Sequence, residues 1–298
     1  MSRYDRARAY LDRVMPAARQ STMTHLFLGQ SNNRTGNSGD TATSPITHTD
    51  VWTIDKDDPA NERDFFALTM DATGTGGTHA HGPGSPAHGI CERVYSRTGL
   101  RQVCKMLAVS GAKMLNAANG PEFHWEVDVN TDDSLVLSDD PNLSDGVRHL
   151  HMPQVDAAFD QRPDFKEDYR VAWWWQGENE HGQMGITSGV DASTYAAALN
   201  KTFNYYRDNW GVDLFCIFKL QDIGADAGEQ ATNAAQTALV RAAHEAVISG
   251  RSDCIEVWDG AIDPANMYDA THPKHDHKLV IGRAAADLML EELGLYTP

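Results

Sequence analysis

Strand-length apolar runs alternate with helical patterns along most of this chain, and that alternation constrains the fold more than any other feature. Helical periodicity is clearest in three segments: Ala192–Trp210, Glu229–Ser249 and His277–Leu293. Asp191 offers an N-cap to the first of them. Five apolar runs have the length of strands: Thr24–Leu28, Phe65–Met70, Gln102–Val109, Tyr169–Trp175 and Val212–Lys219. Strands that alternate with helices predict a parallel sheet covered on both faces. We therefore expect an α/β protein, a three-layer α/β/α sandwich whose mostly parallel sheet has about five strands.

Two segments do not follow this alternation. Residues 35–62 are polar and rich in Gly, Pro, Asp and Thr, and residues 122–163 carry Asp and Asn clusters with little periodicity. Both read as long loops, and long loops at the carboxyl edge of such a sheet usually shape a binding site. No linker divides the chain. We expect a single domain over residues 1–298 with loop insertions near 35–62 and 122–163.

The charge balance bears on partners. The chain has 42 acidic and 25 basic residues among 298, a formal net charge of -17. Such a surface repels nucleic acid and anionic membranes, so neither is expected as a partner. Residues 1–20 are charged and suggest an amphipathic helix rather than a secretory signal or a transmembrane segment. The chain is thus expected to be cytoplasmic, or released and virion-associated, with its oligomeric state open.

The four cysteines show neither a CxxC spacing nor a metal-ligand pattern. Cys216 lies within an apolar run and is expected to be a buried small hydrophobic residue. A disulfide between Cys91 and Cys104 stays open, since their spacing argues neither for nor against it.

The strongest local motif is a strand that ends in Gly29-Gln30-Ser31-Asn32. A strand followed by Gly and a small hydroxyl residue presents a side chain at the carboxyl edge of a sheet, where α/β proteins bind ligands. Ser31 would be exposed there as a candidate nucleophile, which needs a base and an orienting partner for that base. The usual Gly-x-Ser-x-Gly elbow is absent because its fifth position is Asn33.

Asp269-Ala-Thr-His272 supplies the missing groups near the end of the chain. Residues three apart on one turn can face the same way, so Asp269 could hold one ring nitrogen of His272 and leave the other for Ser31. The alternative is a solvated His272 beside an Asp269 that caps a turn.

Two further motifs could complete a site. In Trp173-Trp-Trp-Gln176-Gly-Glu-Asn179-Glu, side-chain amides could donate to an oxyanion, whereas the tryptophans could simply be core residues of a strand. The glycine-rich segment from Gly76 to Pro86 permits close backbone approach, or serves structure alone.

The four motifs together resemble the SGNH hydrolase superfamily, and within it the carbohydrate acetylesterase branch that includes sialate O-acetylesterase-like proteins. The resemblance is carried, in the family's order, by Gly29-Gln-Ser-Asn32, Gly82-Pro-Gly84, Trp175-Gln-Gly-Glu178 and Asp269-x-x-His272. It spans nearly the whole chain except residues 122–163, and it implies the family's flavodoxin-like fold.

The resemblance implies a role for each matching residue. Ser31 would be the nucleophile, His272 the general base and then acid, and Asp269 the orienting partner of His272. The backbone N–H groups of Ser31 and Gly82, or Gly84 in place of Gly82, would form part of the oxyanion hole. Its third donor would be the side chain of Gln176, which we favour, or that of Asn179. Gln30, Asn32 and Glu178 would brace these loops.

The histidines raise the question of a metal. Thirteen are present, and three pairs are two residues apart: His79 and His81, His149 and His151, and His275 and His277. Such pairs can bind zinc, but a third ligand at a recognisable spacing is missing, so we expect no metal. A Walker-type motif is also missing, and no cofactor is expected.

The residues and the resemblance together predict a serine esterase that removes acetyl groups from a carbohydrate through an acyl-enzyme. Activity should fall below about pH 6–6.5, where free histidine protonates. The tryptophans at 125, 173, 174 and 175 could form a sugar platform or pack in the core. Two alternatives stay open: an esterase for small or lipid-like acyl substrates, and an inactive glycan-binding or virion protein on the same fold.

Overall fold

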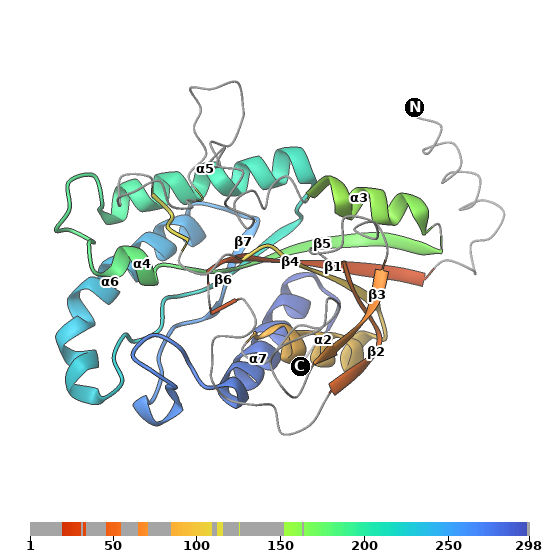
Figure 1. The fold of residues 1–298 in the computed structure, drawn as a ribbon. Coiled ribbons are helices and arrows are strands. Elements are labelled where there is room, and N and C mark those ends of the chain that lie inside the picture. Colours follow the sequence, from red (N-terminus) through yellow and green to blue (C-terminus); the bar gives the residue numbers. More distant parts are fainter. Residues whose placement is uncertain are drawn as a thin grey trace, which may run out of the picture.

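A twisted sheet runs through the middle of the molecule, with helices on both of its faces (Figure 1). The computed structural model describes residues 20–30, 32–33, 46–54, 65–70, 85–108, 112–115, 125, 152–162 and 164–296. Within these residues the sheet has seven strands in the order β3-β2-β4-β1-β5-β6-β7. The strands are β1 (Gln20–Gly29), β2 (Ile46–Ile54), β3 (Phe65–Met70), β4 (Arg101–Met106), β5 (Phe165–Trp175), β6 (Leu214–Phe218) and β7 (Cys254–Trp258). Only the β2–β3 pair of this sheet is antiparallel.

The helices form the two outer layers (Figure 1). They are α2 (Ala87–Thr98), α3 (Met152–Gln161), α4 (Glu178–His181), α5 (Ala192–Trp210), α6 (Ala227–Ser249) and α7 (His275–Glu292), with a short 3₁₀ helix, η3, at Pro264–Asn266. Residues of α2 and α7 share one hydrophobic core with the sheet, whereas residues of α3, α5 and α6 share the other. The structure is thus the three-layer α/β/α sandwich that the sequence predicts.

The end of β5 shows how the sequence builds these layers. Trp173 and Trp175 enter the core on the α2 and α7 side, and Trp174 enters the core on the opposite side. All three are fully buried, because side chains alternate between two covered faces of a central parallel strand. The long helix α5 that follows begins at its predicted cap, where the Asp191 carboxylate accepts from Thr194 N–H at 2.8 Å.

The sheet is larger than predicted. The sequence predicts about five strands and a long loop over 35–62, but β2 occupies 46–54 within that loop, and β7 is a further strand. Residues 152–161 form α3 inside the second predicted loop. The three predicted long helices are present with boundaries that differ by at most two residues. The helix predicted within residues 1–20 lies outside the described residues.

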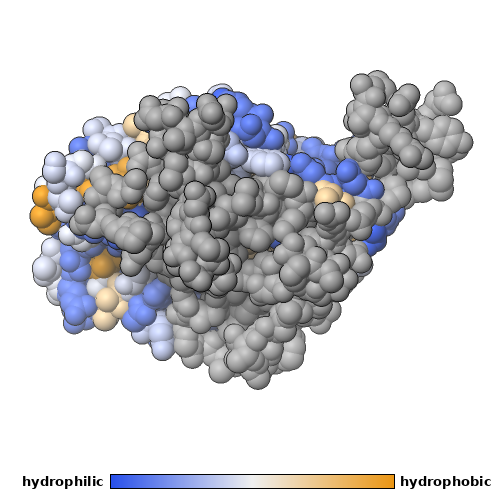
Figure 2. Space-filling model, turned by 45° about the horizontal axis from the view of Figure 1, so that its top comes forward, coloured by the Kyte–Doolittle hydropathy of each residue, from blue (hydrophilic) through white to orange (hydrophobic). Residues whose placement is uncertain are grey.

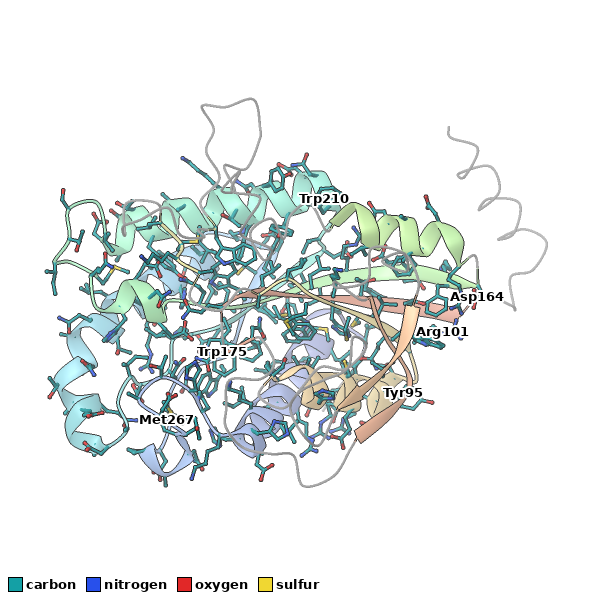
Figure 3. The ribbon with its side chains drawn as sticks, in the orientation of Figure 1. Tyr95, Arg101, Asp164, Trp175, Trp210 and Met267 are labelled. Atoms are coloured by element: carbon teal, nitrogen blue, oxygen red, sulfur yellow. The ribbon has the colours of Figure 1, made fainter. Side chains whose placement is uncertain are left out.

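The chain reverses its winding direction beside β1, and this fixes where a site can form. The helix α2 precedes β4 on one face of the sheet, whereas α5 follows β5 on the other face, and β1 lies between β4 and β5. A parallel sheet opens a crevice at the carboxyl edge of such a switch point. The labelled Trp175 and Met267 lie toward this edge, while Arg101 and Asp164 lie at the other end of the sheet (Figure 3).

The cysteines are buried free thiols. The sulfur atoms of Cys91 on α2 and Cys104 on β4 are 3.2 Å apart without a bond, and burial raises the pKa of Cys104. The disulfide left open by the sequence is therefore not formed here. Cys216 is buried in the core, as predicted.

The surface of the described residues is mostly hydrophilic in the view of Figure 2, with small hydrophobic groups between the hydrophilic ones. Among the helices that the structure describes, none combines the length and the apolar character needed to cross a lipid bilayer.

Candidate active site

The turn after β1 starts at a glycine that no other residue could replace without strain. Gly29 has φ of +100°, and a Cβ there would lie 2.2 Å from the carbonyl oxygen of Trp175 on β5. Gln30 N–H then donates to the same Trp175 oxygen at 3.0 Å. The end of β1 is thereby held directly against the end of β5.

A tight turn follows across the position of the predicted nucleophile. Asn33 N–H donates to the Gln30 carbonyl at 3.0 Å, and the Asn33 side chain donates to the carbonyls of Leu28 at 2.7 Å and Trp173 at 2.6 Å. Both asparagines after Ser31 are fully buried. Ser31 itself lies outside the described residues, but its neighbours in the chain anchor a turn at the carboxyl edge of the sheet.

The contact predicted between Asp269 and His272 is present. His272 Nδ1 lies 2.8 Å from Oδ2 and 3.0 Å from Oδ1 of Asp269. The same carboxylate accepts from the backbone N–H groups of Thr271 and His272, both at 2.7 Å. Asp269 therefore caps the turn and also holds one ring nitrogen of His272. The reach of the other ring nitrogen to Ser31 stays a prediction, because Ser31 lies outside the described residues.

These contacts determine the charge of Asp269. Partial burial alone would raise its pKa, but the hydrogen bonds from His272 and from the two backbone N–H groups outweigh burial and leave the pKa lowered. Asp269 is thus ionised at neutral pH, as a carboxylate that steadies an imidazolium has to be.

Side chains from two other loops connect this pair to the turn after β1. The Asn32 side-chain amide donates to the Glu178 carboxylate, and also to the Thr271 carbonyl at 3.2 Å. Gln221, which follows β6, donates to the same carbonyl at 2.5 Å and accepts from Trp175 Nε1 at 2.9 Å. Three of the predicted motifs, far apart in sequence, therefore meet at one edge of the sheet.

The Glu178 carboxyl lies in this contact network with one of its oxygens shielded from solvent. Burial raises the pKa of its carboxyl, while hydrogen bonds from its own backbone N–H, from Asn32 and from Gln221, together with the nearby His272, act in the opposite direction. A buried carboxylate is stable only when charges or donors balance it, and Asn32 supplies one such donor. The prediction that Glu178 and Asn32 brace neighbouring loops agrees with this geometry.

Gln176, the favoured oxyanion donor, is fully buried at the end of β5. Its Nε2 lies 3.3 Å from Gln30 Oε1, 3.3 Å from the Ala112 carbonyl and 2.5 Å from a carboxylate oxygen of Glu180. Both amide hydrogens thus have acceptors within the protein. Its role as oxyanion donor stays a prediction, and it requires one hydrogen to turn away from these acceptors. Asn179, the alternative donor, is half-buried in α4.

Behind Gln176 lies a buried polar network that the sequence did not reveal. Tyr195 on α5 donates to Gln176 Oε1 and lies 3.2 Å from His244 Nε2 on α6. Burial lowers the pKa of His244 to about 3, so this imidazole is neutral. Only the spacing of four residues between Gln176 and Glu180, about one helical turn, hints at the network.

Glu180 connects the network to a separate segment of the chain. Its carboxylate accepts from the backbone N–H of Met114 and, at 3.2 Å, from that of Leu115. Burial raises the pKa of Glu180 to about 7, although its hydrogen bonds oppose the shift. Because the amide of Gln176 donates to this carboxyl, a change in the protonation of Glu180 changes the hydrogen bonding of Gln176.

Of the two readings that the sequence leaves open for the tryptophans, packing in the core is confirmed and the sugar platform is wrong. Trp173, Trp174 and Trp175 have no exposed surface, and Trp125 is 3% exposed. Trp125 stacks edge-on against Trp174 and donates through Nε1 to the Gly29 carbonyl at 3.1 Å. These side chains build the core under the site, because β5 is covered on both faces.

The remaining site predictions fall on parts of the chain that are not described. Gly82 and Gly84 lie outside the described residues, as do His79, His81, His149 and His151. Within the described residues, no three His, Cys, Asp or Glu side chains gather as a metal site requires.

Comparison with known proteins shows that solved structures share the fold of this chain. Neither the known family models nor the curated protein sequences contain a match to this chain. Among solved structures, NanS aligns with a TM-score of 0.57 at 11% identity, over 93% of this chain and 99% of its own. A protein from Arabidopsis thaliana aligns with a TM-score of 0.55 at 12% identity, over 90% of this chain and 98% of its own. A carbohydrate acetylesterase from Xanthomonas citri aligns at 0.46 and 13% identity, over 92% of this chain and 57% of its own. At these identities the first two likenesses show a shared fold, and the chemistry must be argued from the site residues.

Proposed function

We propose that this protein is a serine esterase that removes acetyl groups from a carbohydrate through an acyl-enzyme intermediate. The observation that supports it most is the contact between Asp269 and His272. This pair is linked to the turn after β1, because the side chain of Asn32, the residue that follows Ser31, donates to the carbonyl of Thr271. An ionised carboxylate, an oriented imidazole and a serine at the carboxyl edge of a parallel sheet are the groups that acyl transfer needs.

In the proposed reaction, Ser31 Oγ attacks the ester carbonyl while His272 Nε2 takes its proton. Asp269 stabilises the resulting imidazolium, because its carboxylate lies 2.8 Å from Nδ1. The carbonyl oxygen becomes negatively charged and is held by the N–H groups of Ser31 and Gly82 and by a side-chain amide, that of Gln176 or Asn179. The C–O bond to the sugar then breaks, and His272 returns its proton to the leaving alkoxide. Water attacks the acetyl-enzyme by the same route and releases acetate.

The substrate class rests on the resemblance to carbohydrate acetylesterases in Trp175-Gln-Gly-Glu178 and the other motifs. A preference for long acyl chains would instead require a deep apolar pocket, and the acyl chain-length series described next tests for it.

Hydrolysis of p-nitrophenyl acetate, butyrate and octanoate tests the proposal. Parent protein, Ser31→Ala and a matched control, Ser252→Ala, are compared; Ser252 is exposed in the turn before β7, at the opposite edge of the sheet. We expect acetate to be turned over fastest, Ser31→Ala to lose at least about 10³-fold in kcat, and Ser252→Ala to match the parent. Acetate release from acetylated monosaccharides and polysaccharides then identifies the sugar.

Each other outcome selects an alternative. Faster turnover of octanoate than acetate would favour an esterase for lipid-like substrates. A folded parent that binds acetylated glycans without turnover, with binding unchanged in Ser31→Ala, would identify an inactive binding protein. Turnover that survives Ser31→Ala would overturn the mechanism.

A further inference from the structure

Glu180 is a buried carboxylate that the mechanism above does not use. It lies in α4 with none of its surface exposed. One of its oxygens accepts from the backbone N–H groups of Met114 and Leu115, and the other lies 2.5 Å from Nε2 of Gln176. All three partners are N–H groups, which can donate but cannot accept. The surroundings of Glu180 are therefore built for an ionised carboxylate.

The Gln176 side chain has two orientations that fit the same space, because its amide oxygen and amide nitrogen are alike in size. An ionised carboxylate can only accept, so Nε2 and not Oε1 has to face Glu180. Oε1 then faces Tyr195 on α5, whose hydroxyl donates to it. Burial raises the pKa of Tyr195, so this hydroxyl keeps its proton. The carboxylate thereby selects one of the two amide orientations.

This selection extends along the buried network. His244 Nε2 lies 3.2 Å from the Tyr195 hydroxyl, and because that hydroxyl donates its proton to Gln176, Nε2 carries a hydrogen and donates to the tyrosine oxygen. Nδ1 of His244 has no hydrogen-bond partner among the described residues, as suits the unprotonated nitrogen of a neutral ring. The hydrogen bonds therefore run in one direction, from His244 through Tyr195 and Gln176 to Glu180.

The second amide hydrogen of Gln176 is held weakly. The acceptors left for it are Gln30 Oε1 and the Ala112 carbonyl, both 3.3 Å from Nε2 and thus longer than an ordinary hydrogen bond. Gln30 immediately precedes Ser31, so this hydrogen lies on the side of the turn that carries the proposed nucleophile. An amide oxygen in its place would repel the negative charge that develops on the carbonyl oxygen of the substrate.

We propose that Glu180 is a positioning residue of the esterase site: its carboxylate fixes the orientation of the Gln176 amide, so that an N–H and not the amide oxygen is presented to the oxyanion. The inference rests on the proposed function, with Gln176 rather than Asn179 as the third donor of the oxyanion hole.

Glu180→Gln removes the selection without changing the size of the side chain. The N–H groups of Met114 and Leu115 still need an acceptor, so the oxygen of the new amide stays on them and its NH₂ group faces Gln176. Gln176 then has to turn over and offer Oε1 to this group, while Tyr195 accepts from Nε2. The amide oxygen of Gln176 would now face the side of Ser31.

The kinetics of p-nitrophenyl acetate hydrolysis test the proposal at about pH 8.5, above the pKa of Glu180. Parent, Gln176→Ala, Glu180→Gln and the double variant are compared. We expect each single variant to lower kcat about 10²–10³-fold with little change in KM, because the oxyanion contact is made only in the transition state. The double variant should lose no more than Gln176→Ala alone, because Glu180 acts only through this amide.

Two controls separate orientation from other effects. Glu291→Gln removes the same charge from an exposed position at the end of α7 and should match the parent. In Tyr195→Phe the carboxylate still selects the orientation, so kcat should fall by less than about tenfold, the value of one neutral hydrogen bond. Where Gln176→Ala does not fold, the comparison of Glu180→Gln with Tyr195→Phe decides.

The proposal is overturned if Glu180→Gln is as active as the parent, if Tyr195→Phe loses as much as Glu180→Gln, or if the losses multiply in the double variant. Full activity of Gln176→Ala would also overturn it, and would leave the esterase with Asn179 as the third donor.

An NMR measurement separates this inference from the proposed function. In protein made with isotopically labelled glutamine, the side-chain amide signal of Gln176 is the one that Gln176→Ala lacks. A charge-assisted hydrogen bond shifts the proton downfield, so the signal should move upfield in Glu180→Gln and stay in place in Glu291→Gln. If the parent shows no turnover, the proposed function fails, and an unmoved signal in Glu180→Gln would also refute the orienting role of Glu180.

Discussion

Substitution of Gly29 by alanine tests the junction on which the site is built. The residue has φ of +100°, a conformation that costs an L-residue about 1–2 kcal/mol. The new Cβ would also lie 2.2 Å from the Trp175 carbonyl oxygen, a backbone atom that cannot rotate away. Strand β1 would have to move from β5, which adds about 1–3 kcal/mol of overpacking and about 1 kcal/mol for the lost Gln30–Trp175 hydrogen bond. We therefore expect Gly29→Ala to lower the free energy of unfolding by about 3–6 kcal/mol.

Gly211→Ala separates backbone strain from collision. Gly211 ends α5 with φ of +59°, and a Cβ there would meet nothing within 4 Å, so only about 1 kcal/mol should be lost. Urea unfolding followed by tryptophan fluorescence measures both variants. The loss expected for Gly29→Ala is a large part of the stability of an ordinary domain, so this variant can be insoluble. In that case the soluble yields of Gly29→Ala and Gly211→Ala are compared, and Gly29→Ala should give the lower yield. Equal losses in the two variants would refute the close contact between β1 and β5.

Three further predictions follow from the site and its buried groups. Asp269→Asn should lower kcat by about 10³–10⁴-fold with little change in unfolding midpoint, because the Asp269 side chain is 44% exposed; a comparable loss of both would contradict its catalytic role. Glu180 has a pKa of about 7 in the folded protein against 4.5 for the free group, so between these pH values the folded state keeps a proton that the unfolded chain has lost. The parent therefore loses stability as pH rises through this range, whereas Glu180→Gln does not. In urea titrations from about pH 4 to 8, the stability of Glu180→Gln relative to the parent should increase by about 3 kcal/mol. Burial lowers the pKa of His25 to about 4 from 6.5, so the parent should lose stability as pH falls from 6.5 toward 4, and His25→Gln should lose less over that range.

The sequence predicts the layers of this fold better than the extent of its sheet. Strand β5 is predictable because its apolar run is unbroken and its second half is fully buried, and helix α5 is predictable because its periodicity is unbroken and one of its faces is buried. Strand β2 reads Ile46-Thr-His-Thr-Asp-Val-Trp-Thr-Ile54, and its polar residues resemble a loop when its partners β3 and β4 are unknown. Strand β7 has five residues at the edge of the sheet, too few for a clear pattern.

The site divides in the same way. The Asp269–His272 contact is local, so a spacing of three residues predicts it. The contact of Asn32 with Glu178 joins residues 146 positions apart. The family resemblance could indicate that each residue braces a loop, but it could not indicate that the two residues contact each other. Glu180 has no signal beyond its spacing from Gln176, because a charged residue on a helix is expected to face solvent, and its burial is decided by the tertiary packing.

Labelling of the nucleophile tests the central claim most directly. Parent, Ser31→Ala, His272→Gln and Ser252→Ala are incubated with a fluorophosphonate, and the modified peptide is identified by mass spectrometry. The account predicts one adduct on Ser31 in the parent and in Ser252→Ala, no adduct in Ser31→Ala, and a rate at least about 10³-fold slower in His272→Gln. Labelling of a different residue, or equal rates in the parent and His272→Gln, would contradict the claim that Ser31, His272 and Asp269 act together.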